Sequence, residues 1–296
     1  MTLAFFHDFE PSSQAVKAWL CPCVRVRPAG MDQTRGMAGG WMLDRYLDRL
    51  KVDWDGRADL HALRRLHRCH LGQVPFENLS VHLGEPVVLD FVELVAKIVV
   101  RRRGGFCYEL NGGFAWLLRS LGYTVDLLEA SVFNAEGTPG PHFDHLVLRV
   151  HLEEPWLVDV GFGDNHTEPL PLRIDVDHVD PSGVFRLVGV PGAGQGDFVD
   201  VLRDDKPQYR LALQAQPLSA FDEMCRFHRT SPESHFTRNT VCSLPTPRGR
   251  ATLRGRTLIV AEDGSRLERQ LDDDDLLACY RDTFGIELQH PPGPRE

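Results

Sequence analysis

The spacing of apolar residues changes at Gly122, and this change restricts the fold more than any other feature of the sequence. Before Gly122, apolar side chains recur every three or four residues, as they do on one face of a helix. After it, runs rich in Val, Leu and Phe favour β-strands with a period of two. These runs are Thr124–Phe133, Leu146–His151, Trp156–Val160, Val184–Val190, Phe198–Leu202, Tyr209–Ala215 and Arg256–Ala261.

Short connections between consecutive strands favour antiparallel pairing, as in a barrel or a meander. In the helical part, Asp90 followed by Glu93 is typical of a capping box at the start of a helix. A last helix is expected at Asp272–Phe284, where an acidic run precedes an apolar face. Helices, then strands, then a mixed C-terminal part predict an α+β fold.

Residues 1–40 differ from the rest, with scattered apolar positions and a glycine-rich end. A secretory signal peptide needs an unbroken apolar block, and charged residues such as Lys17 interrupt this one. We therefore expect residues 1–40 to be an N-terminal extension with little order. Met31 and Met37 are both plausible start sites.

Composition excludes several functional classes. The 296 residues carry a net charge of −9, which argues against a nucleic-acid-binding role. No apolar run is long enough to predict a membrane span. Seven cysteines at irregular spacings favour a reducing cytoplasm over a disulfide scaffold. Cys21 and Cys23 lack a second Cys/His pair, so no metal site is expected.

Cys107 is the first candidate for chemistry. It follows Gly104–Gly105 and opens a helical pattern that ends at Gly122. A cysteine on the first turn lies near the positive end of the helix dipole, which can lower its pKa from about 8.5 to between about 3.5 and 7.5. The alternative interpretation is a small buried apolar residue.

A thiol nucleophile needs a base, and the base needs an orienting group. The sequence offers His145, at the start of one expected strand, and Asp159, in the next. A charged residue in such an apolar strand is costly unless it is paired. On adjacent antiparallel strands the two side chains can meet across the ladder. We therefore predict a catalytic Cys107–His145–Asp159 group.

Three neighbouring residues compete for these roles. His142 lies in a loop rich in Pro and Gly, and Asp164 follows two glycines, where exposure is expected. Asp144 directly precedes His145, so in a strand it is expected to point to the opposite face.

Five segments of the sequence resemble the arylamine N-acetyltransferases. They are Val74–Leu79, Arg102–Phe114, Asp144–Val147, Leu157–Gly163 and Thr230–Phe236, and their order and spacing agree with that family from about Trp41 to about residue 285. The resemblance implies a helical bundle at residues 41–122, a β-barrel at 123–215 and a C-terminal α/β lid and tail at 216–296. It also implies the same Cys-His-Asp triad.

The resemblance further implies the reaction and its substrates. Acetyl-CoA, a co-substrate and not a resident cofactor, acetylates Cys107, and an arylamine, hydrazine or N-hydroxyarylamine then takes the acetyl group. Aromatic residues are expected to line the acceptor pocket, and two glycines to border the CoA path; these are Phe76, Phe162, Phe236, Gly161 and Gly163. Asn111 and Glu77 are expected to serve structure beside the site.

The same triad permits other enzymes. A macrolactam amide synthase would release a carrier-bound polyketide chain onto an aromatic amine, and a cysteine hydrolase would pass the acyl group to water. A non-catalytic relative is disfavoured, because Cys107, His145 and Asp159 are all present. The natural acceptor, the preferred acyl-CoA and the oligomeric state stay open.

Overall fold

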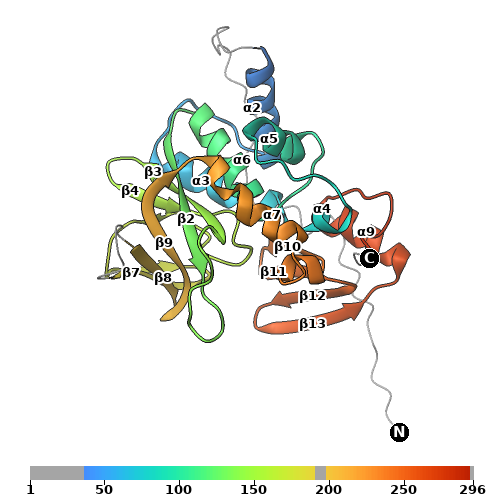
Figure 1. Ribbon diagram of the computed structural model, residues 1–296. Coiled ribbons are helices and arrows are strands. Elements are labelled where there is room, and N and C mark those ends of the chain that lie inside the picture. The colour runs from blue at the N-terminus through green and yellow to red at the C-terminus, as the bar shows by residue number, and fades with distance from the viewer. Residues whose placement is uncertain (1–36, 191–197, 294–296) are drawn as a thin grey trace.

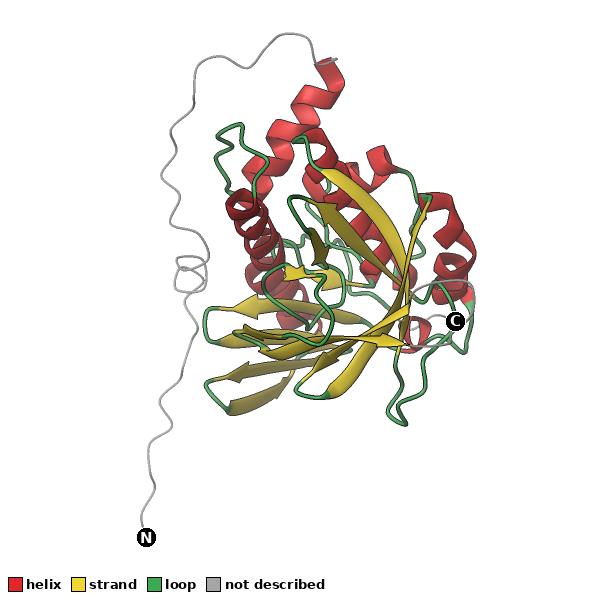
Figure 2. Ribbon diagram, turned by 90° about the vertical axis from the view of Figure 1, so that its left-hand side faces the viewer, coloured by secondary structure: helices red, strands yellow, loops and turns green. Residues whose placement is uncertain are grey.

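Two antiparallel sheets and a set of helices make up the computed structural model, which describes residues 37–190 and 198–293 (Figure 1). The expected N-terminal extension lies outside these residues except at its end. There α2 (Met37–Leu50) already begins at Met37, ahead of the expected start of the regular pattern at Trp41. Figure 2 shows the strands gathered centrally, with helices packed around them on more than one side.

Five of the eight α-helices that the structure describes lie between Met37 and Ser120. They are α2, α3 (Leu60–Gln73), α4 (Leu79–His82), α5 (Phe91–Val99) and α6 (Cys107–Ser120), followed later by α7 (Asp222–Thr230), α8 (His235–Arg238) and α9 (Asp273–Phe284), with a 3-10 turn at Leu218–Phe221. The Asp90 carboxylate accepts hydrogen bonds from the Val92 and Glu93 amides, as expected for the cap of α5. Among the described residues, no helix has the length and hydropathy of a membrane span.

Two adjacent glycines let α5 approach α6 closely. A Cβ at Gly112 would lie 2.6 Å from Leu94 Cδ1, and one at Gly113 would lie 2.6 Å from Ile98 Cδ1. Glycine inside a helix costs about 0.5–1 kcal/mol relative to alanine, so close packing is the compensating gain. This contact sets α6, the helix that begins with Cys107, against the rest of the bundle.

The larger sheet has eight strands and is nearly closed into a barrel. Their order is β5 (Leu170–Pro171), β4 (Pro155–Val158), β3 (His145–His151), β2 (Thr124–Val132), β9 (Lys206–Gln216), β8 (Phe198–Arg203), β7 (Gly183–Val190) and β6 (Asp177–Asp180). The two edges are linked by the Asp180 carboxylate, which accepts hydrogen bonds from the Thr167 and Glu168 amides. The expected α+β fold with a central barrel is confirmed.

The smaller sheet combines distant parts of the chain. Its order is β1 (Phe76–Glu77), β10 (Val241–Thr246), β11 (Gly249–Arg254), β12 (Thr257–Glu262) and β13 (Ser265–Gln270). Phe76 pairs with Ser243, so the segment Val74–Leu79 supplies an edge strand to a C-terminal sheet. Tyr280 and Phe284 of α9 belong to the apolar core of this sheet. The expected boundaries at residues 122 and 215 stay predictions.

Candidate active site

Cys107 is the first residue of α6, as the sequence predicts. The Phe106 amide before it donates a hydrogen bond to Glu109 Oε2 at 3.2 Å, which holds the first turn. The glycines ahead of it are required by close contact: a Cβ at Gly104 would lie 1.8 Å from the Pro75 carbonyl oxygen. At the first helical position the Cys107 amide has no carbonyl of its own helix to bond.

His145 and Asp159 meet as predicted, although not directly across the ladder. His145 Nε2 lies 2.9 Å from Asp159 Oδ2, and both side chains are buried. The strands pair Leu148 with Val158, so continuing that register places His145 opposite Gly161. Asp159 therefore reaches His145 diagonally, from just past the end of β4.

Gly161 fills the position opposite His145 because no side chain fits there. A Cβ at Gly161 would lie 2.8 Å from Cys107 Cα and 2.7 Å from Asn111 Nδ2. The absence of a side chain brings the end of β4 against the start of α6. This contact joins the two elements that carry Cys107 and Asp159.

Asn111, one turn after Cys107, connects the same elements through hydrogen bonds. Its Nδ2 donates to Asp159 Oδ1 at 2.9 Å and to the Leu146 carbonyl at 2.7 Å, and its Oδ1 accepts from the Val160 amide at 2.9 Å. Every polar atom of this buried amide therefore has a partner. Asn111 orients Asp159 directly.

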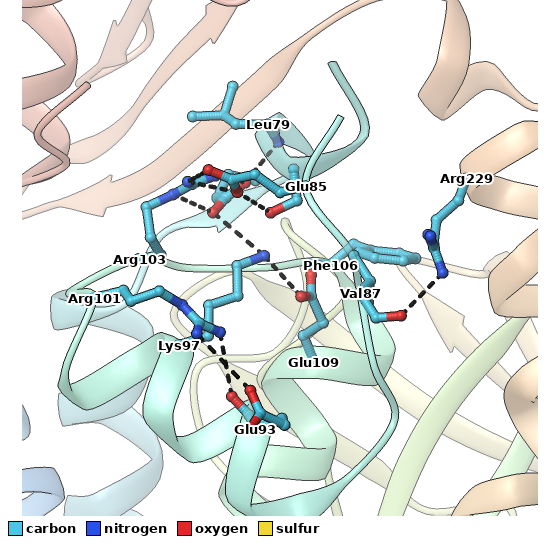
Figure 3. A network of polar contacts seen from close by, with 12 residues as sticks. Leu79, Glu85, Val87, Glu93, Lys97, Arg101, Arg103, Phe106, Glu109 and Arg229 are labelled. Carbon is cyan, nitrogen blue, oxygen red and sulfur yellow. Dashed lines mark hydrogen bonds and ion pairs between the residues drawn. The ribbon is translucent and has the colours of Figure 1, made fainter. Parts of the chain in front are cut away.

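A buried network of charges fixes the start of α6 from the other side (Figure 3). Lys97 Nζ lies 2.7 Å from Glu109 Oε1 and 3.8 Å from Glu77 Oε1. Arg103 bonds Glu77 and Glu85. Burial by itself would raise the pKa of Glu77, but Lys97 and Arg103 hold it below its usual value. The network joins α5, α6 and β1.

The electrostatics of the site correct one expectation from the sequence. Burial raises the pKa of the Cys107 thiol well above its ordinary value, although a backbone hydrogen bond from Leu146 acts in the opposite direction. A lowered pKa was expected from the position of Cys107 at the helix start. That expectation is wrong because the sequence does not show that the thiol is buried. Burial would also raise the pKa of Asp159, but the charge and hydrogen bond of His145 hold it well below its usual range.

A cavity of about 950 Å³ opens onto Cys107 and His145. Phe76, Phe162 and Phe236 line it, as does Gly161, whereas Gly163 is not among its lining residues. Gly163 instead packs on the Phe76 ring, where a Cβ would lie 3.4 Å from Cγ, and has a φ of +95°. Among the described residues, no group of His, Cys, Asp or Glu is placed to hold a metal ion.

Two of the competing residues lie apart from this centre. The His142 side chain is 72% exposed and contacts Glu129, and the Asp164 side chain is 61% exposed and pairs with Arg203 and Arg250. Asp144 lines the cavity beside His145, so the prediction that it points to the opposite face is wrong. It precedes the first residue of β3, and strand alternation does not govern it.

One wall of the cavity is cationic, and none of its residues was predicted from the sequence. Four arginines line it: Arg238, Arg250, Arg254 and Arg266. Arg250 and Arg254 lie on one face of β11, and Ala251 and Leu253 are buried on the other. This alternation was the signal that could have found both β11 and its arginines.

A cysteine at a helix start beside a buried His–Asp pair, open to one large cavity, defines a class of thiol-dependent enzymes that transfer or hydrolyse acyl groups. A family model described as N-acetyltransferase matches residues 59–292. The chain belongs to the arylamine N-acetyltransferase family, and it is an acetyltransferase.

Curated relatives and solved structures agree on this family. The pineal gland isozyme NAT-3 of Gallus gallus is 34% identical over 258 residues, which cover 78% of this chain and 89% of that protein. The Mycolicibacterium smegmatis enzyme is 33% identical over 252 residues, covering 82% and 91%. The Mycobacterium abscessus structure has a TM-score of 0.75 at 31% identity, covering 86% and 94%. The Mycobacterium marinum enzyme, solved in complex with CoA, has a TM-score of 0.73 at 32% identity, covering 82% and 92%.

Proposed function

We propose that this protein transfers an acetyl group from acetyl-CoA, through a thioester on Cys107, to an arylamine, hydrazine or N-hydroxyarylamine. One observation carries the proposal: Cys107 and His145 line one cavity, and His145 Nε2 lies 2.9 Å from Asp159 Oδ2. The Mycobacterium marinum relative, crystallised with CoA, supports a CoA thioester as the donor.

In the first step, His145 takes the proton of Cys107. Since Nε2 of His145 bonds Asp159, Nδ1 is the nitrogen available to the thiol. Burial disfavours an isolated thiolate, so proton transfer accompanies attack on the thioester carbonyl. The Cys107 amide on the first helical turn is the proposed donor to the oxyanion. Asp159 stabilises the imidazolium, which then protonates the leaving CoA thiolate.

In the second step, an amine attacks the acetyl-cysteine and His145 accepts its proton. Water competes with the amine, so the acceptor end of the cavity should be apolar. Phe162 packs edge-on against the His145 ring with centroids 5.3 Å apart, and the Phe76 and Phe236 rings lie 6.1 Å apart. We assign these three rings to the acceptor and Gly161 to the path of the pantetheine arm.

The cationic wall is the proposed site for the CoA phosphates. A guanidinium group matches phosphate oxygens in pairs, and four arginines face this cavity: Arg238, Arg250, Arg254 and Arg266. Asp164 pairs with Arg250 at 3.3 Å. Gly163 supports the Phe76 ring from outside the cavity, so we place CoA along Gly161 alone.

We also propose a cytoplasmic location, with acetyl-CoA and small amines as the partners. Cys107, Cys225, Cys242 and Cys279 are free thiols, which fits a reducing compartment.

Free CoA and intact mass test the proposed reaction. The protein is incubated with acetyl-CoA, with and without isoniazid or an aminobenzoate, and Cys107→Ala serves as the control. We expect amine-dependent CoA release and a transient acetyl adduct that the control lacks. Equal release without amine would indicate a hydrolase. No adduct would contradict the proposal and direct attention to carrier-bound thioesters, the substrates of an amide synthase.

A further inference from the structure

Asp144 is a cavity residue for which the proposed reaction has no use. It lies directly before His145, yet both residues line the cavity with Cys107. The reason lies one residue earlier, where Phe143 adopts a left-handed conformation with a φ of +62°. The Tyr108 hydroxyl holds this turn by donating to the Phe143 carbonyl at 2.7 Å. Left-handed backbone at a bulky residue is costly and concentrates at functional sites.

His228 of α7 lies beside the Asp144 carboxylate. His228 Nε2 lies 3.0 Å from Asp144 Oδ1, and His228 Nδ1 lies 3.2 Å from the Ser234 hydroxyl. The Ser234 oxygen already accepts the Phe236 amide, so its own proton is free for Nδ1. Nδ1 is then the acceptor and Nε2 carries the proton towards Asp144.

The Asp144 carboxylate keeps unused acceptor capacity. Its side chain is 16% exposed, and the Val132 amide reaches Oδ2 only at 3.4 Å. His228 Nε2 is close, but it makes no well-directed hydrogen bond. A carboxylate has about four acceptor positions, so a ligand in the cavity can bond this one without displacing a partner.

The position of this carboxylate works against acylation. Asp144 is the foremost charge among those that raise the pKa of Cys107, ahead of Asp159. A carboxylate that shares a cavity with a nucleophilic thiol therefore needs a compensating use. Both co-substrates carry N–H donors, the pantetheine arm in its amides and the acceptor in its amine, and the acceptor is the one that meets the uncharged acetyl-cysteine.

We propose that Asp144, which lies beside His228, determines acceptor specificity by accepting a hydrogen bond from a second N–H or O–H donor on the amine. The favoured class is hydrazides, aminophenols and aromatic diamines, and acceptors with a carboxylate are disfavoured by charge repulsion. This proposal rests on the proposed acetyl transfer. A purely structural clamp between α7 and the start of β3 would affect stability without changing the order of acceptors.

The test compares near-isosteric acceptors: aminophenol, anisidine, which lacks the donor, and aminobenzoate, which is anionic, each as ortho and para isomers. In a two-step exchange, kcat/KM for the acceptor depends only on the reaction of the acetyl-enzyme with the amine. An effect of the substitution on acylation by acetyl-CoA therefore does not change this value. In Asp144→Asn, we expect kcat/KM for aminophenol relative to anisidine to fall roughly tenfold in at least one isomer series, the loss of one charge-assisted hydrogen bond. The ratio of aminobenzoate to anisidine should rise. Asp164→Asn, a carboxylate on the arginine side, should change neither ratio.

Unchanged ratios in both series of Asp144→Asn would overturn the specificity role while leaving acetyl transfer intact. Should wild-type protein acetylate no amine at all, both proposals fail. A second measurement needs no variant: catechol, guaiacol and salicylate, which cannot be acetylated as amines, compete with the acceptor in the wild-type protein. We expect inhibition constants to increase in that order, and the reverse order would contradict the role of Asp144.

Discussion

Asp159 is a residue whose hydrogen bonds dictate its chemistry. Its Oδ1 accepts from Asn111 Nδ2 and from the Gly161 amide, both at 2.9 Å, while Oδ2 faces His145. The two carboxylate oxygens therefore differ, because Oδ1 has two close donors, whereas Oδ2 has His145 at 2.9 Å and Asn165 Nδ2 only at 3.4 Å. Oδ2 is left to accept the N–H at Nε2 of His145. Nδ1 of His145 is then unprotonated towards Cys107.

Replacing Asp159 with Asn should therefore set the wrong tautomer. The donors at Oδ1 will keep the amide oxygen there and turn the NH2 group towards His145 Nε2. His145 would then carry its proton on the nitrogen that must accept one from Cys107. We expect acylation by acetyl-CoA to slow by roughly 10³–10⁴-fold, as for a similar change in a serine protease. Stopped-flow measurement of CoA release tests this, and a loss under tenfold with native thermal stability would contradict it.

A substitution at Gly161 tests how closely the end of β4 must approach the start of α6. In Gly161→Ala the new Cβ would lie 2.8 Å from Cys107 Cα, a backbone atom that cannot move aside without shifting α6. We expect at least a hundredfold loss in kcat/KM and about 1–3 kcal/mol of lost stability. Gly189→Ala is the matched control, because its Cβ would meet Ile174 at an ordinary 3.7 Å. Equal urea midpoints and activities for the two variants would disprove the close-contact argument.

At the scale of elements, Lys97 joins α5, α6 and β1 through buried charges (Figure 3). Burial raises the pKa of Glu109, and Lys97 counteracts that shift. Removing the cation would leave Glu109 and Glu77 with less compensation in a buried site. The network is thus an essential support for the first turn of the helix that begins with Cys107.

Lys97→Met should destabilise the fold by about 3–5 kcal/mol, since breaking a buried pair leaves an uncompensated charge. Arg101→Met is the control, because Arg101 and Glu93 form an exposed pair that contributes at most about 1 kcal/mol. Urea unfolding at neutral pH measures both. Adding Glu109→Gln to Lys97→Met should recover part of the loss, and a further loss in the double variant would count against the buried-pair explanation.

The elements also show what could be predicted from the sequence. Strands with apolar runs, such as the two beside His145 and Asp159, were predicted within a few residues. The strand Ser265–Gln270 was missed because all its side chains are exposed. Without a buried face, its sequence does not alternate between apolar and polar residues. Asp144 was placed on the wrong face because the left-handed Phe143 leaves no sequence signal. The raised pKa of Cys107 depends on burial, which only the assembled fold produces.

At the scale of the whole molecule, the cavity belongs to no single layer. Its walls come from the start of α6, the barrel strands, α7 and α8, and the smaller sheet. His67 of α3 shows the same interdependence, because its ring nitrogens lie 3.0 Å from the Thr167 carbonyl and 3.1 Å from the Asp159 carbonyl. The helical layer is thereby tied to the barrel directly behind the proposed triad.

The buried histidines make the stability of this assembly depend on pH. Burial lowers the pKa of His67 to about 4, despite its two carbonyl partners, and also lowers the pKa of His70 and of His166. An unfolded histidine titrates near about 6.5. Below that pH the unfolded chain binds protons that the folded protein does not bind. The free energy of unfolding is therefore highest above about pH 6.5 and falls as pH decreases towards about 4.

His67 alone should account for roughly 3 kcal/mol of this loss between pH 6.5 and 4. Urea unfolding at pH 7.5, 6 and 5 measures the slope. His67→Gln should be less stable at pH 7.5, because it loses one carbonyl contact, yet its stability should fall less steeply with acid. His142→Gln, at a side chain that is 72% exposed, is the control for the loss of a surface histidine. An identical slope in His67→Gln and wild type would show that His67 is already protonated in the fold, with its two carbonyl contacts outweighing burial.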